Sequence, residues 1–391
     1  MKKEILIISN YFPPESGAAS NRIYSLAKKL SDNSYDVSVI CPLPNYPEGR
    51  VYDDYRGLFS KKEFIGNIVI KRLFIYASNS SNKFLRLLSS LSFAIVLFQY
   101  ILFNNVPKKV IIQGSPLIVG FIAVLSCRIK SRKIILNVSD LWPLAGLEMG
   151  ILNKGFYYNI LLTLETYIYK NSDIIVGQSN EILNHVSNTI SIKNKILFLY
   201  RNFPDFEALS VKKKNNKNYK IVYAGLLGLA QGIESICNEI DFPKDTEFHI
   251  YGNGPKESEI DKICKSKSQI FYHGSLKREK LHSVLQDYDA TLIPLKNRIY
   301  GSVPSKIFEY SKLGLPIIYF SDGEGAELVS NLNLGISIRK ANYKELQRVI
   351  EQINNGDVKL PSKQKVLNIS FREFDLEKQF ENFENQVLSH Q

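Results

Sequence analysis

The segment from Lys220 to Gly232 has the sequence KIVYAGLLGLAQG, and it shows the unit from which we expect the fold to be built. Its first five residues form an apolar run of the length of a buried strand, and three glycines follow before a helical pattern begins. Glycine beside a strand end lets a ligand approach the main chain closely, and a helix start offers N–H groups to an anion. A turn with tight packing would also explain the glycines.

The first half of the chain opens in a similar way. Residues 4–9 form a short apolar run, and a longer loop containing Gly17 leads to a helical pattern at 20–30. This loop lacks the GxGxxG turn of dinucleotide-binding dehydrogenases, so it disfavours that class. Gly17 permits close approach of a ligand to the backbone, although a plain strand-to-helix turn is the alternative.

Strand and helix patterns alternate through both halves of the sequence, which predicts an α/β fold with a doubly wound parallel sheet in each. At 391 residues the chain is too long for one ordinary core. We therefore expect domains at 1–205 and 206–370, facing a cleft, and a polar helix at 371–391 that packs back toward the first domain. The expected strands are 4–9, 36–41, 68–74, 109–113, 134–137, 173–176, 220–224, 247–251, 269–272, 290–294 and 316–320.

Composition narrows the class of protein. A hydrophobic content of 45% with 23% charged residues is typical of a globular chain, and four scattered cysteines indicate neither a zinc site nor a disulfide framework. The net charge of +12 lies mostly in the first half, where residues 1–205 carry 24 Lys and Arg against 14 Asp and Glu. This asymmetry favours an anionic partner, such as nucleic acid, an acidic membrane face or a phosphate-bearing acceptor. An ordinary solvated surface is the alternative.

One apolar segment complicates this picture. Residues 87–103 contain no formal charge, and Lys83, Arg86, Lys108 and Lys109 flank them. A buried core helix and a helix lying against anionic headgroups both fit this pattern. A membrane span fits less well, because it would separate strands that we expect in one sheet.

A more specific pattern occupies residues 304–310, which have the sequence PSKIFEY. Proline favours a helix start, but Lys306 in the first turn is unfavourable there because the positive end of the helix dipole lies at that end. A bound diphosphate would make this lysine favourable. Glu309, one turn later, has two acceptor oxygens suited to the vicinal hydroxyls of a ribose. An ordinary amphipathic helix is the alternative interpretation.

With this segment in view, the chain resembles the family 4 retaining glycosyltransferases of the GT-B fold, and within them the bacterial O-antigen and capsule branch that includes N-acetyl-L-fucosamine transferases. The resemblance rests on YFPPE at 11–15, PNYPEG at 44–49, DLWP at 140–143, YGNGP at 251–255 and PSKIFEY at 304–310. It implies a nucleotide-sugar donor in the second domain, an acceptor in the first, and no required metal or other cofactor.

The resemblance also implies the residues that bind the donor. The expected donor residues are Gly17, Arg201, Gly225, Gly228, Gly254, Ser305, Lys306 and Glu309. The family often has a glutamate where this chain has Gly301, and an Arg and a Lys where it has Leu226 and Gln231. Neutralisation of the diphosphate is then expected to depend on Lys306, with Arg201, Lys296 or Arg298 as helpers.

Asp140 is the candidate catalytic residue, because it follows the predicted strand 134–137 at the edge where open α/β sheets bind ligands. It could accept a proton from the acceptor hydroxyl, orient the sugar, or simply cap the next helix. Glu15, Tyr46 and Glu48 are the candidate acceptor-binding residues. Since no second carboxylate is placed as a nucleophile, we expect front-face transfer in which the leaving diphosphate helps to deprotonate the acceptor.

The expected function is transfer of an N-acetylated deoxyhexose or hexosamine from UDP to a polyprenyl-diphosphate-linked saccharide, with retention, at the cytoplasmic face of the membrane. The expected partners are this donor, this acceptor and an anionic membrane surface, but no nucleic acid. A UDP-sugar 2-epimerase of the same fold and a non-enzymatic basic membrane-surface module are the rival hypotheses. The module would leave Lys306 and Glu309 unexplained.

Overall fold

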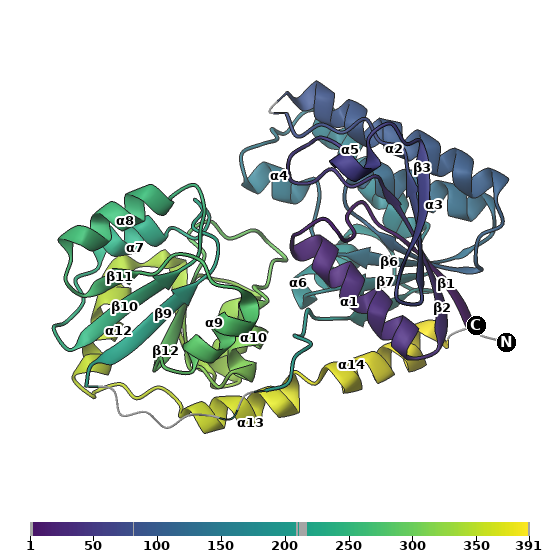
Figure 1. Cartoon of the computed structure of the whole chain (residues 1–391). Helices are drawn as coiled ribbons and strands as arrows, with labels where there is room; N and C mark the ends of the chain where they lie inside the picture. Colours follow the sequence, from purple (N-terminus) through teal and green to yellow (C-terminus); the bar gives the residue numbers. More distant parts are fainter. Residues whose placement is uncertain (1–2, 81, 209, 211–216, 390–391) are drawn as a thin grey trace. The chain divides into compact units, whose positions relative to one another are not determined.

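The computed structural model describes residues 3–80, 82–208, 210 and 217–389. The chain divides into two compact units, Met1–Arg201 with Phe380–Gln391, and Asn202–Gln379. Each unit is a sheet with helices on both faces; the strands of the first sheet are mostly parallel, and those of the second are all parallel (Figure 1). The predicted α/β class with two doubly wound sheets is confirmed.

The first unit contains an eight-stranded sheet in the order β3-β4-β2-β1-β5-β6-β7-β8, in which only β3 is antiparallel to its neighbour. Its strands are β1 (Lys3–Ile8), β2 (Tyr35–Pro42), β3 (Ser60–Ile65), β4 (Ile68–Leu73), β5 (Lys109–Gln113), β6 (Lys133–Val138), β7 (Ile174–Gly177) and β8 (Ile196–Leu199). Its helices are α1 (Ala18–Asp32), α2 (Lys83–Phe103), α3 (Leu117–Ile129), α4 (Leu144–Glu148), α5 (Phe156–Lys170) and α6 (Asn180–Thr189).

Alternation along the central strands divides the core of the first unit into two layers. Ile5 and Ile7 of β1 face one side and join a cluster with Ile23 of α1 and with Phe380 and Phe383 near the C-terminus. On the other side of the sheet α3 contacts β5 and β6, and α2 and α5 flank α3. The first unit therefore includes a helical layer of α2, α3 and α5.

Helix α2 is the apolar segment noted in the sequence. Phe93, Ala94, Leu97 and Ile101 are buried, so one side of the helix belongs to the domain core. In the part of the chain that the structure describes, α2 is also the one helix long and apolar enough to cross a membrane, with only 28% of its most apolar window buried. Because α2 joins β4 to β5 of one sheet, it covers that sheet in this fold.

The second unit contains a six-stranded parallel sheet in the order β11-β10-β9-β12-β13-β14. Its strands are β9 (Tyr219–Ala224), β10 (Thr246–Tyr251), β11 (Ile270–Tyr272), β12 (Ala290–Pro294), β13 (Ile317–Phe320) and β14 (Gly335–Ile338). Its helices are α7 (Ile233–Glu239), α8 (Glu257–Ser266), α9 (Arg278–Leu285), α10 (Lys306–Lys312), α11 (Glu324–Asn331), α12 (Tyr343–Asn354) and α13 (Lys363–Glu373). The strand order reverses between β9 and β12, which marks the place where open α/β sheets bind ligands.

The C-terminal segment differs from the continuous polar helix expected at 371–391. Helix α13 ends at Glu373, α14 spans Leu376–Phe383, and a π-helical turn covers Glu384–Leu388. Phe380, Phe383, Val387 and Leu388 are buried in the core of the first unit. Residues 390 and 391 of the predicted element lie outside the described residues.

Candidate active site

Two glycine-containing loops lie side by side at the carboxyl edge of the second sheet. The Gly225 N–H donates to the carbonyl of Tyr251 at 2.9 Å, and the Leu227 N–H donates to the carbonyl of Asn253 at 2.9 Å. A Cβ at Gly252 would lie 1.8 Å from the Gly225 carbonyl oxygen, and one at Gly254 would lie 2.7 Å from that of Leu227. Gly254, a predicted donor residue, is therefore required first of all by this close approach between loops.

Helix α10 brings Lys306 against the first of these loops. A Cβ at Gly225 would lie 2.9 Å from Lys306 Cε, so the glycine makes room for the lysine chain. Lys306 Nζ donates to Tyr310 Oη at 2.7 Å, and that hydroxyl donates to the Ala224 carbonyl at 2.6 Å. Burial lowers the pKa of Lys306, and the charge of Glu309 opposes this shift. Two predicted donor residues, Gly225 and Lys306, thus lie together.

Glu309 lies one turn along α10 among three cationic or hydrogen-bonding groups. His282 Nε2 lies 2.8 Å from Glu309 Oε1, and Arg278 Nε donates to the same oxygen at 3.2 Å. Burial alone would raise the pKa of Glu309, but the His282 hydrogen bond, Lys306 and Arg278 together lower it to about 2. The carboxylate is therefore ionised at neutral pH. Both of these contacts reach Oε1, and the side chain keeps 15% exposure.

His282 and Arg278 were not anticipated from the sequence. They lie one turn apart on α9, so both side chains leave the same side of that helix. The His282 ring also packs against Phe206, with 4.5 Å between ring centroids. The i, i+4 spacing of an Arg and a His was available in the sequence, but nothing in it indicated that α9 packs beside α10.

The other predicted donor residues are distributed as follows. Gly228 is buried in the loop after β9, and a Cβ there would lie 2.8 Å from Gln231 Oε1. Ser305 is exposed at the N-cap of α10 and makes no side-chain capping bond. Lys296 Nζ donates to Ser235 Oγ at 3.0 Å, and Arg298 packs against Gly323. The structure therefore directs Lys296 toward α7.

Gly301 stands where the resemblance to the family implied that a glutamate is common, and its backbone favours glycine. Its φ angle is 84°, in the left-handed region that favours glycine. A glutamate at this position would be strained.

Asp140 lies in the first unit, just beyond β6, within a network of neutral side chains. Ser139 Oγ lies 3.3 Å from Asp140 Oδ2, and Gln113 Nε2 donates to Ser139 Oγ at 2.9 Å. Asp140 is exposed and does not cap the next helix, because the N-cap of α4 is Pro143. The capping alternative is therefore wrong.

Arg22 of α1 is another residue that the sequence did not single out. Its Nη1 donates to Gln178 Oε1 at 2.7 Å, and Gln178 Nε2 donates to the Ser139 carbonyl at 2.6 Å. Burial lowers the pKa of Arg22, and the nearby Asp140 charge partly opposes this shift. Gly17 lies at the N-cap of the same helix, and Arg201 is buried where the first unit ends. The first unit thus contains two of the predicted donor residues, Gly17 and Arg201, together with the candidate catalytic residue Asp140. The other predicted donor residues belong to the second unit.

Comparisons with known proteins agree with this geometry. The sequence pattern of the family "Glycosyl transferases group 1" matches residues 218–355, which contain the loops after β9 and β10 together with Lys306 and Glu309. An Escherichia coli (strain K12) protein described as a colanic acid biosynthesis glycosyl transferase, WcaI, is 22% identical over 75% of this chain and 74% of its own length.

Solved structures extend the similarity to both units. Sucrose-phosphate synthase from Thermosynechococcus elongatus aligns over 99% of this chain and 100% of its own, with a TM-score of 0.73 and 12% identity. The lipopolysaccharide outer core galactosyltransferase WaaB aligns over 99% of both chains, with a TM-score of 0.65 and 16% identity. Anabaena HepE in complex with UDP aligns over 100% of this chain and 100% of its own, with a TM-score of 0.69 and 12% identity.

Residues 218–355 thus match the group 1 glycosyltransferase family, and the chain as a whole has the GT-B fold. This confirms the expected enzyme class, a retaining family 4 glycosyltransferase, and the predicted fold. The rival hypothesis of a non-enzymatic basic module is not supported.

One predicted acceptor residue of this glycosyltransferase has a different place from the one expected. Glu15 is only 2% exposed, and its carboxylate accepts the main-chain N–H groups of Phe12, Asn45 and Tyr46 at 3.2, 2.8 and 2.9 Å. Burial raises its pKa, and these hydrogen bonds oppose the shift. The expectation that Glu15 contacts the acceptor directly is corrected: it joins two loops.

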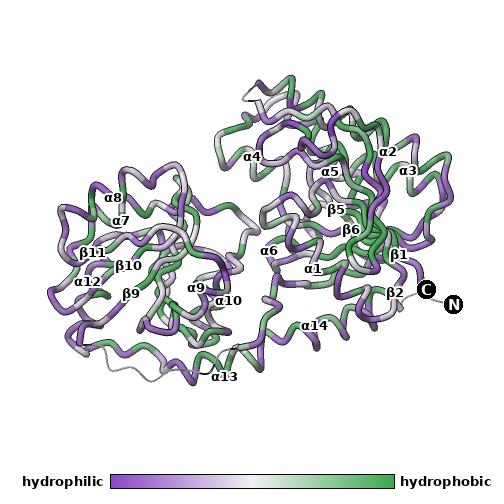
Figure 2. The backbone as a smooth tube through the Cα atoms, viewed as in Figure 1, coloured by the Kyte–Doolittle hydropathy of each residue, from purple (hydrophilic) through white to green (hydrophobic). Residues whose placement is uncertain are grey.

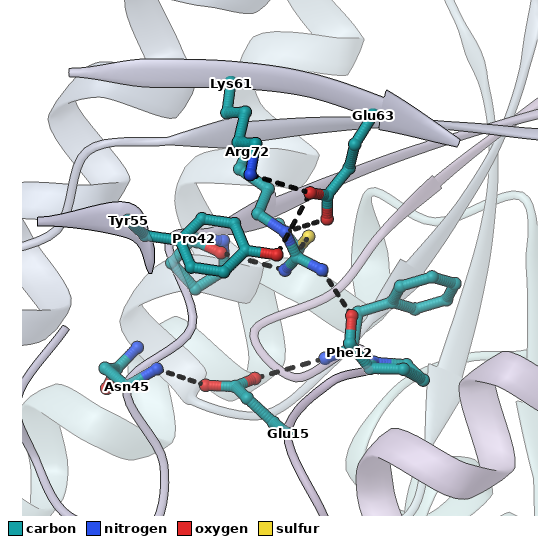
Figure 3. Close-up of polar contacts among 10 residues, drawn as sticks. Phe12, Glu15, Pro42, Asn45, Tyr55, Lys61, Glu63 and Arg72 are labelled. Atoms are coloured by element: carbon teal, nitrogen blue, oxygen red, sulfur yellow. Dashed lines mark hydrogen bonds and ion pairs between the residues drawn. The ribbon is translucent and has the colours of Figure 1, made fainter. Parts of the chain in front are cut away.

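The fully buried Arg72 of β4 supports the same loops (Figure 3). Its Nε donates to Glu63 Oε1 at 2.5 Å, Nη1 lies 3.3 Å from Cys41 Sγ, and Nη2 donates to the Pro13 carbonyl. Glu15 and Arg72 together fix the loop after β1 to the loop after β2, because each binds main-chain groups of that region.

Tyr46 and Glu48, the remaining predicted acceptor residues, stay exposed on the loop fixed by Glu15. The Tyr46 ring packs edge-on against Tyr11, with 5.3 Å between centroids.

In the described ranges of the chain no group of three or more His, Cys, Asp or Glu side chains could hold a metal ion.

Proposed function

We propose that the second domain binds a uridine diphosphate sugar through Lys306 and Glu309. The observation that carries this proposal is the Glu309 carboxylate, which is ionised and fixed through Oε1 by His282 and Arg278. Its second oxygen can accept hydrogen bonds from a ribose diol. HepE supports the choice of nucleotide, since it is a protein of the same fold solved in complexes with UDP and UDP-glucose.

Lys306 supplies the charge that a diphosphate requires. Its side chain is largely buried beside Gly225. Because Gly225 has no side chain, a bound ligand can come close to the main chain there. A buried lysine gains more from an anion than an exposed one, since water screens their attraction less. Gly228 and Ser305 are the proposed main-chain and hydroxyl contacts around it.

For the acceptor we propose a polyprenyl-diphosphate-linked saccharide of capsule or O-antigen synthesis. The curated relative is described as acting in colanic acid biosynthesis, and WaaB is described as a lipopolysaccharide enzyme. The basic first half suits a diphosphate-bearing lipid, and Tyr46 and Glu48 are exposed polar groups of that half. The donor sugar proposed is an N-acetylated deoxyhexose or hexosamine, and the site of action is the cytoplasmic face of the membrane.

Asp140 is the proposed catalytic group. The neutral network of Gln113, Ser139 and Gln178 can hold its carboxylate toward an acceptor hydroxyl. Transfer on the front face then follows, with the leaving diphosphate taking part in deprotonation of the acceptor. Arg22, whose charge interacts with that of Asp140, lies beside this network in the proposal.

The test is the affinity for UDP of Glu309→Ala, measured by titration calorimetry. Loss of charge-assisted hydrogen bonds to the ribose is expected to weaken binding about thirtyfold or more. Glu327→Ala, an exposed glutamate on α11 of the same domain, is the matched control and should bind like the wild type. Unchanged affinity in Glu309→Ala would remove the donor-site assignment.

A second measurement distinguishes transfer from the 2-epimerase hypothesis. Labelled UDP-sugar is incubated with and without a polyprenyl-diphosphate saccharide, and the products are separated into lipid and aqueous phases. A transferase should place the label in the lipid phase only when the acceptor is present. Epimer or free UDP formed equally without acceptor would contradict the proposal.

A further inference from the structure

The outward side of α2 is apolar although it does not contribute to the core. Phe84, Leu88, Leu91 and Ile95 are 63%, 37%, 37% and 58% exposed. Their spacing of four, three and four residues places them in one stripe along the helix. The buried Phe93, Leu97 and Ile101 lie on the other side, so folding of the domain does not require this stripe.

Exposed apolar side chains also occur on another helix of the same layer. Helix α3 contacts both α2 and α5, which makes the three helices neighbours. At the start of α5, Phe156 is 84% exposed, and Tyr157 and Ile160 are exposed beside it. Figure 2 shows hydrophobic residues recurring along the tube of α2, α3 and α5. We call the exposed side chains of α2 and α5 together the apolar face; large exposed patches of this kind mark interaction sites.

The charges of the segment that contains α2 have one sign. Between Glu63 and Asp140 the sequence contains ten Lys and Arg residues and no Asp or Glu. Arg86 of α2 and Lys108 after it are exposed, and Lys154 is exposed just before α5. Apolar side chains bordered by cations are the combination that binds anionic headgroups, since the apolar groups insert while the cations meet phosphate.

The same features argue against other occupants. A second copy of this chain would bring a second acid-free segment to the interface, so like charges would oppose each other. A span across the bilayer would pull Phe93, Leu97 and Ile101 out of the core of the first unit. If α2 lies on the bilayer surface, its buried side stays in the core of the first unit and its exposed apolar side contacts the lipid.

We propose that the apolar face of α2 and α5 docks the first domain on an anionic phospholipid bilayer, with Phe84, Leu88, Leu91, Ile95 and Phe156 inserted at the headgroup level. This deepens the proposed function and rests on its membrane-borne acceptor, since it names the surface that holds the enzyme where such an acceptor lies. The second domain plays no part in this docking.

The test is flotation of the full chain with vesicles of phosphatidylcholine alone and of phosphatidylcholine with about 30% phosphatidylglycerol. The wild type should float with the anionic vesicles at low salt and less so at high salt. Leu88→Gln/Leu91→Gln/Ile95→Gln should reduce binding about a hundredfold, because each inserted side chain contributes about tenfold or less. Phe371→Gln, at a 54% exposed position on α13 of the second unit, is the matched control and should float like the wild type.

UDP affinity of the same variants separates this inference from the donor proposal, since the triple variant should bind UDP normally if it is folded. Phe156→Gln provides a second variant on another helix and should reduce flotation about tenfold. Flotation of the triple variant equal to that of the wild type would overturn the proposal. So would absence of binding to anionic vesicles, or a change of oligomeric state by sedimentation in place of a change in lipid binding.

Discussion

Glu15 in the first domain and Glu309 in the second are both largely buried carboxylates close to the carboxyl edge of a parallel sheet, yet their pKa values move in opposite directions. Burial raises the pKa of Glu15, whereas His282, Lys306 and Arg278 overcome burial and lower that of Glu309 to about 2. The three hydrogen bonds of Glu15 described above come from main-chain N–H groups, and those of Glu309 come from ionisable side chains.

The difference teaches how the two sheet edges divide their tasks. In the first domain, the buried carboxylate and Arg72 fix loops, and the exposed Asp140 has the Ser139 hydroxyl as its hydrogen-bond partner, with Arg22 nearby. In the second domain, the charged groups themselves form the candidate site. Removing a charge should therefore mainly affect stability in the first domain and ligand affinity in the second.

The largest expected effect is the loss of stability in Arg72→Met. This change leaves Glu63 and the Pro13 carbonyl without the buried guanidinium, so we expect the free energy of unfolding to fall by about 3–5 kcal/mol. Urea denaturation followed by circular dichroism measures it. Arg56→Met, which removes an exposed pair with Asp53, should cost less than about 1 kcal/mol. Equal losses in both variants would contradict the structural role of Arg72.

A smaller effect, on activity, is expected from Lys306→Met in the second domain. Without its charge, attraction for a diphosphate is lost, and kcat/KM should fall about a hundredfold while stability changes little. The rate of sugar transfer at several donor concentrations gives this value. Lys280→Met, at an exposed position of α9, is the control and should leave kcat/KM unchanged. If both variants keep full activity, the division between the two domains does not hold.

The smallest expected effect is on the free energy of unfolding at acid pH. Because the folded pKa of Glu309 lies below its ordinary value of 4.5, its contribution is fully present above pH 4.5 and is lost as the pH falls toward 2. We expect this contribution to be about 2 kcal/mol after allowance for solvent access. Glu15 should act with the opposite sign, since its raised pKa costs stability as the pH rises through that value.

Unfolding free energies of Glu309→Gln and Glu15→Gln between pH 2 and 6 test both signs. The pH dependence should become flatter in Glu309→Gln and steeper in Glu15→Gln. The same change in both variants would show that the two carboxylates do not differ as described.

Much of this fold follows from the sequence, because buried parallel strands are continuous apolar runs that glycine loops and helices interrupt. The expected strand at 220–224 lies within β9, and that at 290–294 coincides with β12. Strand β3 was missed, since its residues alternate between half-buried and exposed at the sheet edge. The short turn at Gly66 and Asn67 that joins it to β4 was its available signal.

The candidate site was only partly predictable. Lys306 and Gly225 could be expected at one edge, because both follow carboxyl ends of parallel strands. The contacts of Glu309 with α9, and of Glu15 with the loop after β2, join residues that the chain pattern does not relate. Those contacts decide whether a carboxylate is available to a ligand or is hydrogen-bonded to main-chain N–H groups. Residue type alone therefore assigned Glu15 wrongly.

The C-terminal segment packs into the first domain, and this affects how the protein folds while it is being translated. Phe380, Phe383, Val387 and Leu388 belong to the core of a domain whose other residues end at Arg201. During translation, the second domain is complete before these side chains emerge from the ribosome. The domain that is made first is therefore the last to be finished, and a ribosome that stops before Phe380 releases a first domain with an unfilled core.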